Sequence, residues 1–271
     1  MLEKRSIIIE GKEYQVILSD QKEALLAARA AGRAFVGVLT SEGDQDLSPA
    51  QYLVENVEDA DDRFLERIVR RKLGLPWVIG ESSRLLVREF VPEDAEQMLP
   101  ETEDRDGDRV FQSRELLEAY IGNQYGFFEY GMWAVVRKRD GKVIGKAGIC
   151  GCGEVPLPGA GEAVKPESGY TSGGSEAVKP EPADGGRDAM ELGYHLAAPY
   201  RGRGYGREAC RIILSYIEEM YDAPVYARVQ PDNTASVRLL EALGFQRKGP
   251  EDGSISGASC MLFWKDQGHL T

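Results

Sequence analysis

Hydrophobic and polar residues in the first eighty positions follow the pattern of a small α/β module. Two short apolar runs flank a segment that is rich in alanine, leucine, lysine and glutamate and that ends at Gly32. Short apolar runs predict β-strands, and this composition predicts a helix between them. Further along, apolar residues recur at helical spacing up to Gly74-Leu-Pro76, which predicts a second helix. The predicted elements are strands at 14–18 and 34–39, a helix at 21–31, a short strand at 51–54 and a helix at 59–73.

Residues 1–80 contain no histidine, no cysteine and no phosphate-binding loop. We therefore expect a module that packs against the rest of the chain or presents a substrate. A separate ligand-binding role is the alternative.

The sequence changes character at Arg84, and we expect a second domain at 84–266. Its clearest local feature is a hairpin, in which Arg139-Asp-Gly141 separates two apolar runs. The helix at 208–220 is strongly amphipathic, which predicts a core helix. The expected elements are strands at 84–91, 133–136, 143–149, 190–197, 225–229 and 260–264, and helices at 92–98, 114–122, 208–220 and after Asn233.

A low-complexity stretch interrupts this domain at about 153–187. It is rich in glycine, proline, alanine and glutamate, and the sequence Glu-Ala-Val-Lys-Pro-Glu occurs twice, at 162–167 and 176–181. No periodicity there can bury an apolar face, so we expect a disordered insertion between two adjacent strands. A mobile lid near the substrate is the alternative.

Composition narrows the partners that the protein can have. The 271 residues are 42% hydrophobic, and the formal net charge is −12. No segment approaches the roughly 18 uninterrupted apolar residues of a membrane span, and the apolar run at the start is too short for a signal peptide, so we expect a cytoplasmic protein without a membrane partner. The negative charge disfavours binding to nucleic acid and attracts cations such as an amine.

Metal binding is not expected from the cysteines and histidines. Cys150 and Cys152 are the only close pair among four cysteines, and the two histidines, His195 and His269, form no cluster with them. A zinc site would need further ligands nearby. We expect ordinary buried or half-buried thiols and no metal.

The stretch Glu191–Arg207 contains a pattern that is typical of anion binding. An apolar run leads into a glycine-rich turn with two arginines, and an amphipathic helix follows. Glycines let the backbone approach a ligand, and the N–H groups and dipole of the helix attract negative charge. The turn is neither a Walker P-loop, because no Gly-Lys-Ser/Thr follows, nor a dinucleotide fingerprint, because its spacing is Arg-x-x-Gly-x-Gly.

Arg201-Gly-Arg-Gly-Tyr-Gly206 resembles the pyrophosphate loop of the GNAT N-acetyltransferases, which bind acetyl-CoA. A second motif is similar to the same family: Asn233-x-x-Ser236, a helix, and then Leu243-Gly-Phe245. The resemblance covers residues 84–265 apart from the insertion. Glu191-Leu-Gly-Tyr194 together with Asn-x-x-Ser looks most like the RimJ/RimL type, which includes ribosomal-protein N-terminal acetyltransferases.

This resemblance implies an α/β (α+β) protein with the GNAT fold, a mixed and mostly antiparallel central sheet flanked by helices. It also implies transfer of an acetyl group from acetyl-CoA to a primary amine, on a protein N-terminus or a small molecule, by direct attack in a ternary complex. The alternative is a non-catalytic acyl-CoA-binding or regulatory module on the same fold. The implied acetyl-CoA-binding residues are Leu196, Ala197, Arg201, Gly202, Arg203, Gly204, Tyr205, Gly206, Arg207 and Asn233.

Three residues are candidates for the chemistry. Glu191 is the first choice for a general base, because it matches a glutamate of the family's fourth strand; a strand-end carboxylate is the alternative. His195 lies four residues along the same strand face and is a second candidate base or substrate contact. Many relatives protonate the leaving thiolate with a tyrosine at the position of Leu240, so the resemblance offers Ser236 as the acid, against an ordinary helix first-turn residue.

Overall fold

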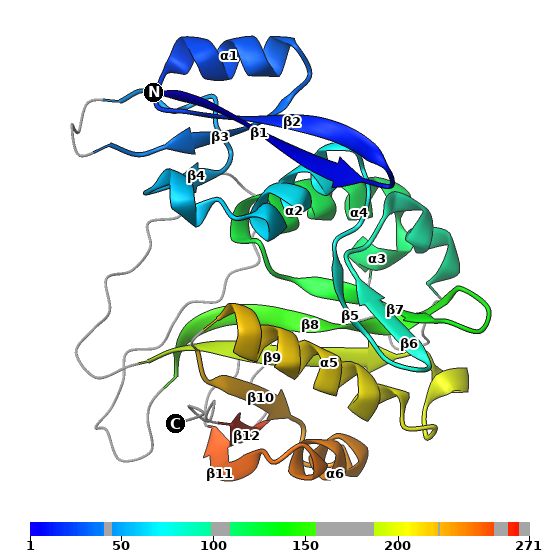
Figure 1. Cartoon of the computed structure of the whole chain (residues 1–271). Coiled ribbons are helices and arrows are strands. Elements are labelled where there is room, and N and C mark those ends of the chain that lie inside the picture. The colour runs from blue at the N-terminus through cyan, green and yellow to red at the C-terminus, as the bar shows by residue number, and fades with distance from the viewer. Residues whose placement is uncertain (41–44, 99–108, 156–186, 222, 252–259, 266–271) are drawn as a thin grey trace. The chain divides into compact units, whose positions relative to one another are not determined.

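The computed structural model describes residues 1–40, 45–98, 109–155, 187–221, 223–251 and 260–265 (Figure 1). The expected insertion lies mainly outside these residues. Contacts divide the chain into two compact units. Unit 1 comprises Met1–Val78, Glu89–Glu96 and Glu103–Glu129, and unit 2 comprises Ile79–Arg88, Gln97–Thr102 and Tyr130–Thr271.

Unit 1 begins with a β-hairpin that the sequence analysis did not predict. Strands β1 (Leu2–Ile9) and β2 (Lys12–Ser19) pair in antiparallel fashion with Ile9 opposite Lys12. The two turn residues, Glu10 and Gly11, have φ angles of 52° and 78°. Positive φ at both positions is what a tight two-residue hairpin requires, because its twist then matches that of the strands.

The predicted β-α-β pattern is present, and β2 of the hairpin is its first strand. Helix α1 (Lys22–Ala30) connects β2 to β3 (Ala34–Val38), which pairs parallel to β2. The short strand β4 (Leu53–Val54) extends the sheet, and a 3₁₀ turn, η1 (Val57–Asp59), follows it.

Helix α2 (Asp62–Lys72) matches the second predicted helix of this part of the chain. The Asp61 side chain accepts a hydrogen bond from Phe64 N at 2.7 Å, which caps the first turn. Gly74, with φ of 70°, ends the helix in the left-handed conformation. The face of α2 that carries Leu65 and Ile68 packs with buried residues of the sheet into one core.

Two later parts of the chain belong to unit 1 and contact α2. Arg71 on α2 donates to Glu89 at 2.7 Å and lies 3.4 Å from Glu129. Glu89 also accepts a hydrogen bond from Trp77 N at 3.2 Å and is only 3% exposed. Arg71 thus joins α2 to Glu89 and to Glu129.

The helical part of these segments differs from the prediction. The expected α-helix at 92–98 is a 3₁₀ segment, η2 (Pro92–Gln97). Helix α3 (Arg109–Gln112) precedes α4 (Arg114–Tyr120), which continues as the π-helical segment η3 (Ile121–Phe128). Gly122 and Gly126 within η3 are poor helix formers, which explains why the sequence pattern stopped the helix at Gly122.

Unit 2 contains a mixed sheet, in which the described strands are ordered β11-β12-β10-β9-β8-β7-β6-β5. Strand β9 pairs parallel with β10, whereas the pairs β6–β7, β7–β8, β8–β9, β10–β12 and β11–β12 are antiparallel. The strand bounds are β5 (Val78–Glu81), β6 (Leu85–Arg88), β7 (Met132–Arg137), β8 (Lys142–Val155), β9 (Arg187–Leu196), β10 (Val225–Val229), β11 (Gln246–Glu251) and β12 (Cys260–Lys265). The expected mixed, mostly antiparallel sheet is therefore confirmed.

Strands β8 and β9 are longer than predicted. Their ladder reaches Val155 opposite Arg187, so both edges of the expected insertion belong to strands. Glycine and glutamate have low strand propensity, so the local sequence does not indicate this extension. Pairing with the neighbouring strand determines it.

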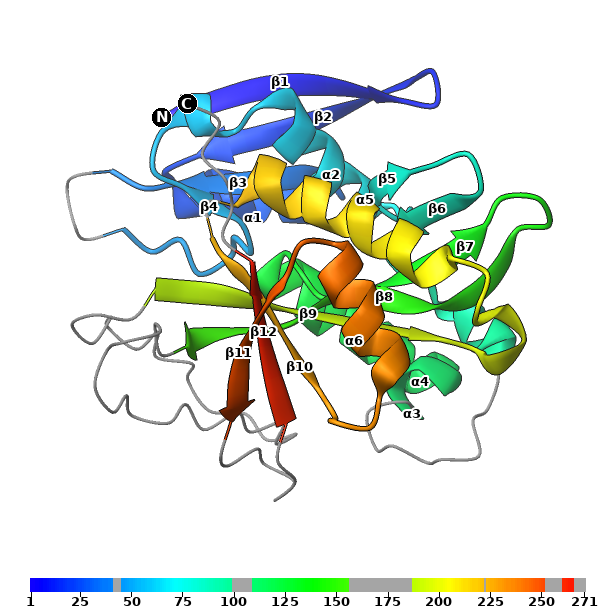
Figure 2. The ribbon, with the colours of Figure 1, turned by 90° about the horizontal axis from the view of Figure 1, so that it is seen from below.

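Two helices lie next to each other over one face of this sheet (Figure 2). Helix α5 (Tyr205–Met220) contacts β6, β8 and β9, and it buries Cys210, Ile213 and Ile217. Helix α6 (Thr234–Ala242) contacts α5 and β11. Among the described residues, no helix has the length and apolar character needed to cross a membrane.

Candidate active site

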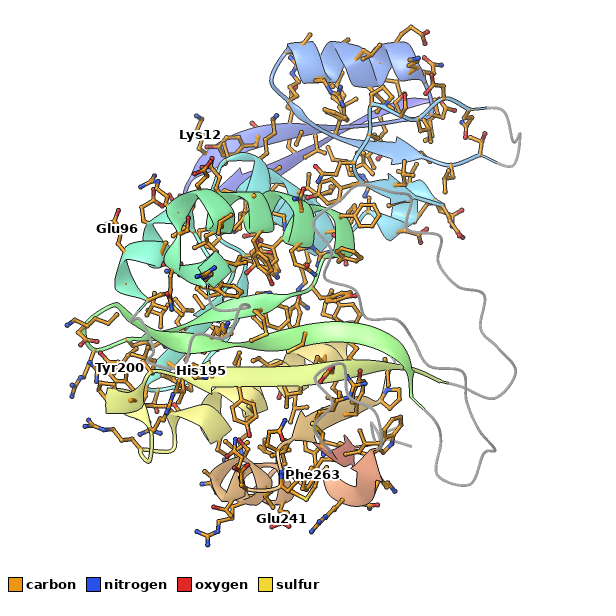
Figure 3. The ribbon with its side chains drawn as sticks, turned by 180° about the vertical axis from the view of Figure 1, so that it is seen from behind. Lys12, Glu96, His195, Tyr200, Glu241 and Phe263 are labelled. Atoms are coloured by element: carbon orange, nitrogen blue, oxygen red, sulfur yellow. The ribbon has the colours of Figure 1, made fainter. Side chains whose placement is uncertain are left out.

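The glycine-rich turn connects the end of β9 to the first turn of α5. A short 3₁₀ turn, η4 (Ala198–Tyr200), leads into it (Figure 3, Tyr200). Gly202 and Gly204 have φ angles of 71° and 79°, which residues with a Cβ adopt only at a cost. Gly204 is the N-cap of α5 and supplies no side-chain hydrogen bond, so the first N–H groups of the helix are available to a ligand.

The two arginines of this turn and Arg207, in the first turn of α5, have different surroundings. Arg201 Nε donates to Leu196 O at 2.7 Å, and its Nη2 lies 3.2 Å from His195 Nε2, so this side chain fixes the turn to the end of β9. Arg203 and Arg207 are exposed at the start of α5. They are the cations of the turn that can reach an anion in solvent.

Arg84, which the sequence analysis did not select, holds the turn from the other side. Its Nε donates to Glu208 Oε2 at 2.8 Å, and its Nη1 donates to the carbonyl of Arg203 at 3.2 Å. Its guanidinium also lies over the ring of Tyr205, 4.6 Å from the centroid. This arrangement joins the start of β6 to the first turn of α5.

The strand before the turn loses its partner on one side. The parallel pairing of β9 with β10 includes Met190 and Glu191, whereas β9 remains paired with β8 as far as Leu196. Ala197 N donates to Ile144 O at 3.0 Å and so faces β8. Because N–H groups alternate along a strand, that of Leu196 faces the side on which β10 has departed. A ligand amide or thioester can bind the backbone there.

Glycines allow the elements around this strand end to approach closely. A Cβ at Gly206 would lie 3.1 Å from Leu239 and 3.7 Å from Leu196, so the first turn of α5 brings α6 and β9 together. At Gly145 on β8, a Cβ would lie 2.3 Å from the carbonyl oxygen of His195.

Glu191 lies beside two polar side chains of β10. Its Oε2 accepts from Arg228 Nη1 at 3.0 Å, and the Tyr226 hydroxyl lies 3.3 Å away. The pair is about three-quarters buried, with side-chain exposures of 28% for Arg228 and 21% for Glu191. The guanidinium stabilises the ionised carboxylate. Sequence reasoning missed Arg228, because pairing between separate strands leaves no local pattern.

His195 lies on the same strand (Figure 3), and its Nε2 lies 3.2 Å from Arg201 Nη2. A guanidinium can only donate, so this contact requires the tautomer with the lone pair on Nε2. Arg201 then occupies Nε2 of His195, just as Arg228 and Tyr226 lie at Oε2 of Glu191.

The second motif forms the start of α6. Asn233 accepts a hydrogen bond from Ser236 N at 3.1 Å, so it caps the helix, as its ordinary structural role predicts. Ser236 is half-buried in the first turn. Leu240 is completely buried, so this position contributes only packing.

The residues of unit 2 fit acetyl-CoA as a bound substrate. The turn offers backbone N–H groups and two exposed cations for a pyrophosphate, and the unpaired edge of β9 continues from it. The part of the chain that the structure describes contains no cluster of His, Cys, Asp and Glu able to hold a metal ion.

Unit 1 has a cavity of its own, with a volume of about 550 Å³. Aromatic and cationic side chains line it, among them Phe35, Tyr52 and Arg71. It contains none of the candidate residues for catalysis or for acetyl-CoA binding.

Comparison with known proteins agrees with this geometry. Residues 84–246, more than half of the chain, match the model of the acetyltransferase (GNAT) domain family. The uncharacterized N-acetyltransferase p20 of Bacillus licheniformis is 35% identical over 60 residues, which are 22% of this chain and 34% of that protein. The uncharacterized N-acetyltransferase YnaD of Bacillus subtilis (strain 168) is 34% identical over 65 residues, which are 24% of this chain and 38% of that protein. The matches thus span little more than a third of these relatives.

A solved structure supports the fold. The ribosomal-protein-S5-alanine acetyltransferase of Vibrio fischeri is similar with a TM-score of 0.51 and 18% identity, covering 71% of this chain and 98% of that one. The family model, the sheet order and the turn at the start of α5 all agree with the resemblance found in the sequence. The chain belongs to the acetyltransferase (GNAT) domain family.

Proposed function

We propose that this protein is an N-acetyltransferase that transfers an acetyl group from acetyl-CoA to a primary amine. The observation that carries the proposal is the junction of β9 with α5, where left-handed glycines, N–H groups and exposed arginines lie beside an unpaired strand edge. Acetyl-CoA needs both halves of this junction. The turn and the start of α5 would bind its pyrophosphate, and the edge of β9 would bind its amide-containing arm. The residues that would hold it are those of the turn, 201–207, together with the backbone at Leu196 and Ala197; Asn233 supports them by capping α6.

Acetyl-CoA supplies an activated acetyl group, and the chain's own residues must deliver a neutral amine to it. An α-amino group, with a reference pKa of 7.7–8.0, is roughly one-tenth neutral at pH 7, and a lysine amine is less than about one part in a thousand neutral. A carboxylate that accepts the amine proton is therefore useful. Glu191 takes this role, while Arg228 keeps it ionised and His195 contributes to the same strand face.

The acceptor is a protein N-terminus or a small-molecule amine. The net charge of −12 favours approach of a cationic amine. A peptide N-terminus is the first acceptor to test, because it needs less deprotonation than a lysine side chain and because a similar structure is named for acting on a ribosomal protein. This choice also agrees with the RimJ/RimL-like motifs of the sequence. We expect the enzyme to act in the cytoplasm, without nucleic acid or membrane as a partner.

The test is release of free CoA, measured with a thiol reagent, from acetyl-CoA in the presence of peptides and small amines. We expect acceptor-dependent release and an acetylated product of the corresponding mass. Titration calorimetry with acetyl-CoA is run in parallel. Binding without release for any acceptor would favour the alternative, a non-catalytic acyl-CoA-binding module, and absence of binding would contradict both.

A further inference from the structure

Tyr194 on β9 has a buried hydroxyl without an evident function. Among the described residues its oxygen makes no hydrogen bond of ordinary geometry, although the Ser236 side chain lies near enough to act on it. Buried polar atoms are almost always paired, so an orphaned phenol inside a candidate active site calls for an explanation. The mechanism above does not use it.

The position of this hydroxyl follows from two surfaces that both contact the region of Gly206, one face of β9 and one side of α6. Tyr194 and Leu196 are two residues apart on β9 and therefore share one face of the strand. Ser236 and Leu239 are three residues apart on α6 and therefore share one side of the helix. Since Leu196 and Leu239 both reach Gly206, Tyr194 and Ser236 point into the same region.

Electrostatics at the phenol agree with this placement. Burial raises the pKa of Tyr194 to about 12, and the nearby Ser236 side chain acts in the opposite direction. Cys210, on the next turn of α5 after Gly206, is the other group that influences it. The tyrosine is thus enclosed by α5 and faces the start of α6.

We propose that Tyr194 is a positioning residue, whose O–H donates to Ser236 Oγ and so directs the Ser236 O–H toward the sulfur of CoA. The two hydroxyls together would stabilise the departing thiolate in place of a tyrosine at position 240, where Leu240 is buried. This inference rests on the proposed acetyl transfer. Serine offers one O–H and accepts hydrogen bonds through its lone pairs, so it can serve both neighbours at once.

The proton balance does not require Tyr194 to ionise. In the reaction a C–N bond forms and the C–S bond of the thioester breaks; the amine loses one proton and the thiolate finally gains one through solvent. A thiol has a reference pKa of about 8.5, so a phenol with a pKa of about 12 keeps its proton and acts only as a hydrogen-bond donor. The pair lowers the energy of the thiolate without changing the net reaction.

The first test titrates the thiol of bound CoA by the ultraviolet absorbance of its thiolate, with complexes of desulfo-CoA as the blank. Hydrogen bonds to charged groups are the stronger ones, so we expect Tyr194→Phe and Ser236→Ala each to reduce the thiolate fraction at a given pH about tenfold. The double variant should show no further reduction, because Tyr194 acts through Ser236. Ser236→Thr, which keeps a hydroxyl, should restore the wild-type titration.

The second test is kinetic. We expect Tyr194→Phe to lower kcat about tenfold with an unchanged KM for acetyl-CoA, and to have no effect when Ser236 is already alanine. Tyr216→Phe is the matched control, because Tyr216 is a buried tyrosine of α5 that packs against Trp133 with ring centroids 5.5 Å apart. It should leave both the titration and kcat at the wild-type value.

The outcomes separate this inference from the proposed function. If the wild type binds CoA and acetylates an amine but Tyr194→Phe changes neither titration nor kcat, the inference is wrong and the function stands. Additive effects of Tyr194→Phe and Ser236→Ala would equally overturn it, since they would show independent roles. If the wild type binds no CoA, the proposed function falls and this inference falls with it.

Discussion

Glu208, in the first turn of α5, accepts hydrogen bonds from Arg84, which lies 124 residues earlier at the start of β6. Ser82 donates to the same carboxylate. The carboxylate lies at the positive end of the helix dipole, and the guanidinium extends to the carbonyl of Arg203. One ion pair thus sets the position of the glycine-rich turn relative to the sheet.

We expect Arg84→Ala to weaken acetyl-CoA binding up to about fivefold, because an ion pair that solvent still reaches contributes about 0–1 kcal/mol. Titration calorimetry measures this. Lys138→Ala is the control, because the N–H of Lys138 donates to Arg84 O at 2.9 Å but its ammonium pairs with Glu81 at 2.8 Å and not with the turn. Equal affinities for Arg84→Ala and the wild type would show that the turn keeps its shape without this contact.

The same pair has a pH signature. Partial burial opposes ionisation of Glu208, but hydrogen bonds from Arg84 and Ser82 outweigh it and lower the carboxyl pKa from its ordinary value of 4.5. A depressed pKa stabilises the folded state above the unfolded value, and this stabilisation is lost as the pH falls through the folded pKa. We expect the stability difference between wild type and Glu208→Gln to be constant at neutral pH and to shrink below about pH 4.5. Thermal unfolding at several pH values measures it, and a difference that does not change with pH would contradict the assignment.

Glycine at position 204 is predicted to matter for binding beyond its effect on stability. Gly204 and Gly32 have φ angles of 79° and 67°, and a Cβ at either position meets no backbone atom within 4 Å. Replacement by alanine should therefore cost each about 1–2 kcal/mol of stability through backbone strain alone. Only Gly204→Ala should also raise the dissociation constant for acetyl-CoA, because Gly32 lies in unit 1. Calorimetry and urea unfolding of both variants check this, and an unchanged affinity in Gly204→Ala would remove the turn from the binding site.

Local sequence pattern predicted most elements of unit 2, because their signals lie within single segments. The strand at 225–229 is found with the predicted bounds, and Asn233 caps the helix that follows it. Strand β11 was missed, since Gln246–Glu251 contains glycine and proline, and its pairing with β12 decides its structure.

The candidate site was predictable only as far as its motifs extend. The turn at 201–206 can be recognised from the spacing of its arginines and glycines. The residues that bind Glu208 and Glu191 on either side of it come from distant segments. Arg84 reaches Glu208, and Arg228 reaches Glu191, through the order of strands in the sheet rather than through sequence spacing. In unit 1, too, the partners of Arg71 come from later in the chain, since it donates to Glu89 and lies 3.4 Å from Glu129.

Loss of Arg71 should strongly destabilise unit 1. Arg71 and Glu89 have side-chain exposures of only 10% and 4%. Arg71→Met would leave Glu89 as a buried charge without its main partner, which costs about 3–5 kcal/mol. The exposed pair of Arg114 with Glu93 in the same unit is the control, and Arg114→Met should change stability by at most about 1 kcal/mol. Urea unfolding measures the free energy of unfolding of both variants. Equal decreases would mean that burial of the Arg71 pair does not affect stability.

Arg228 should set the pH range in which Glu191 can act as the base. Glu191→Gln removes the proton acceptor, so we expect kcat to fall about a hundredfold or more while the affinity for acetyl-CoA is unchanged. Arg228→Met keeps the carboxylate but removes the guanidinium that stabilises its ionised form at 3.0 Å, so Glu191 holds its proton to higher pH. The acidic limb of the kcat/KM profile should then move upward by about one pH unit or more.

Arg211→Met, on the exposed side of α5, is the control and should leave the pH profile in place. A shift to lower pH in Arg228→Met, or full turnover in Glu191→Gln at every pH, would exclude Glu191 as the base. In the second case His195 would have to be released from Arg201 to accept the proton, and Arg201→Ala should then raise kcat, since the lone pair on Nε2 would no longer be occupied.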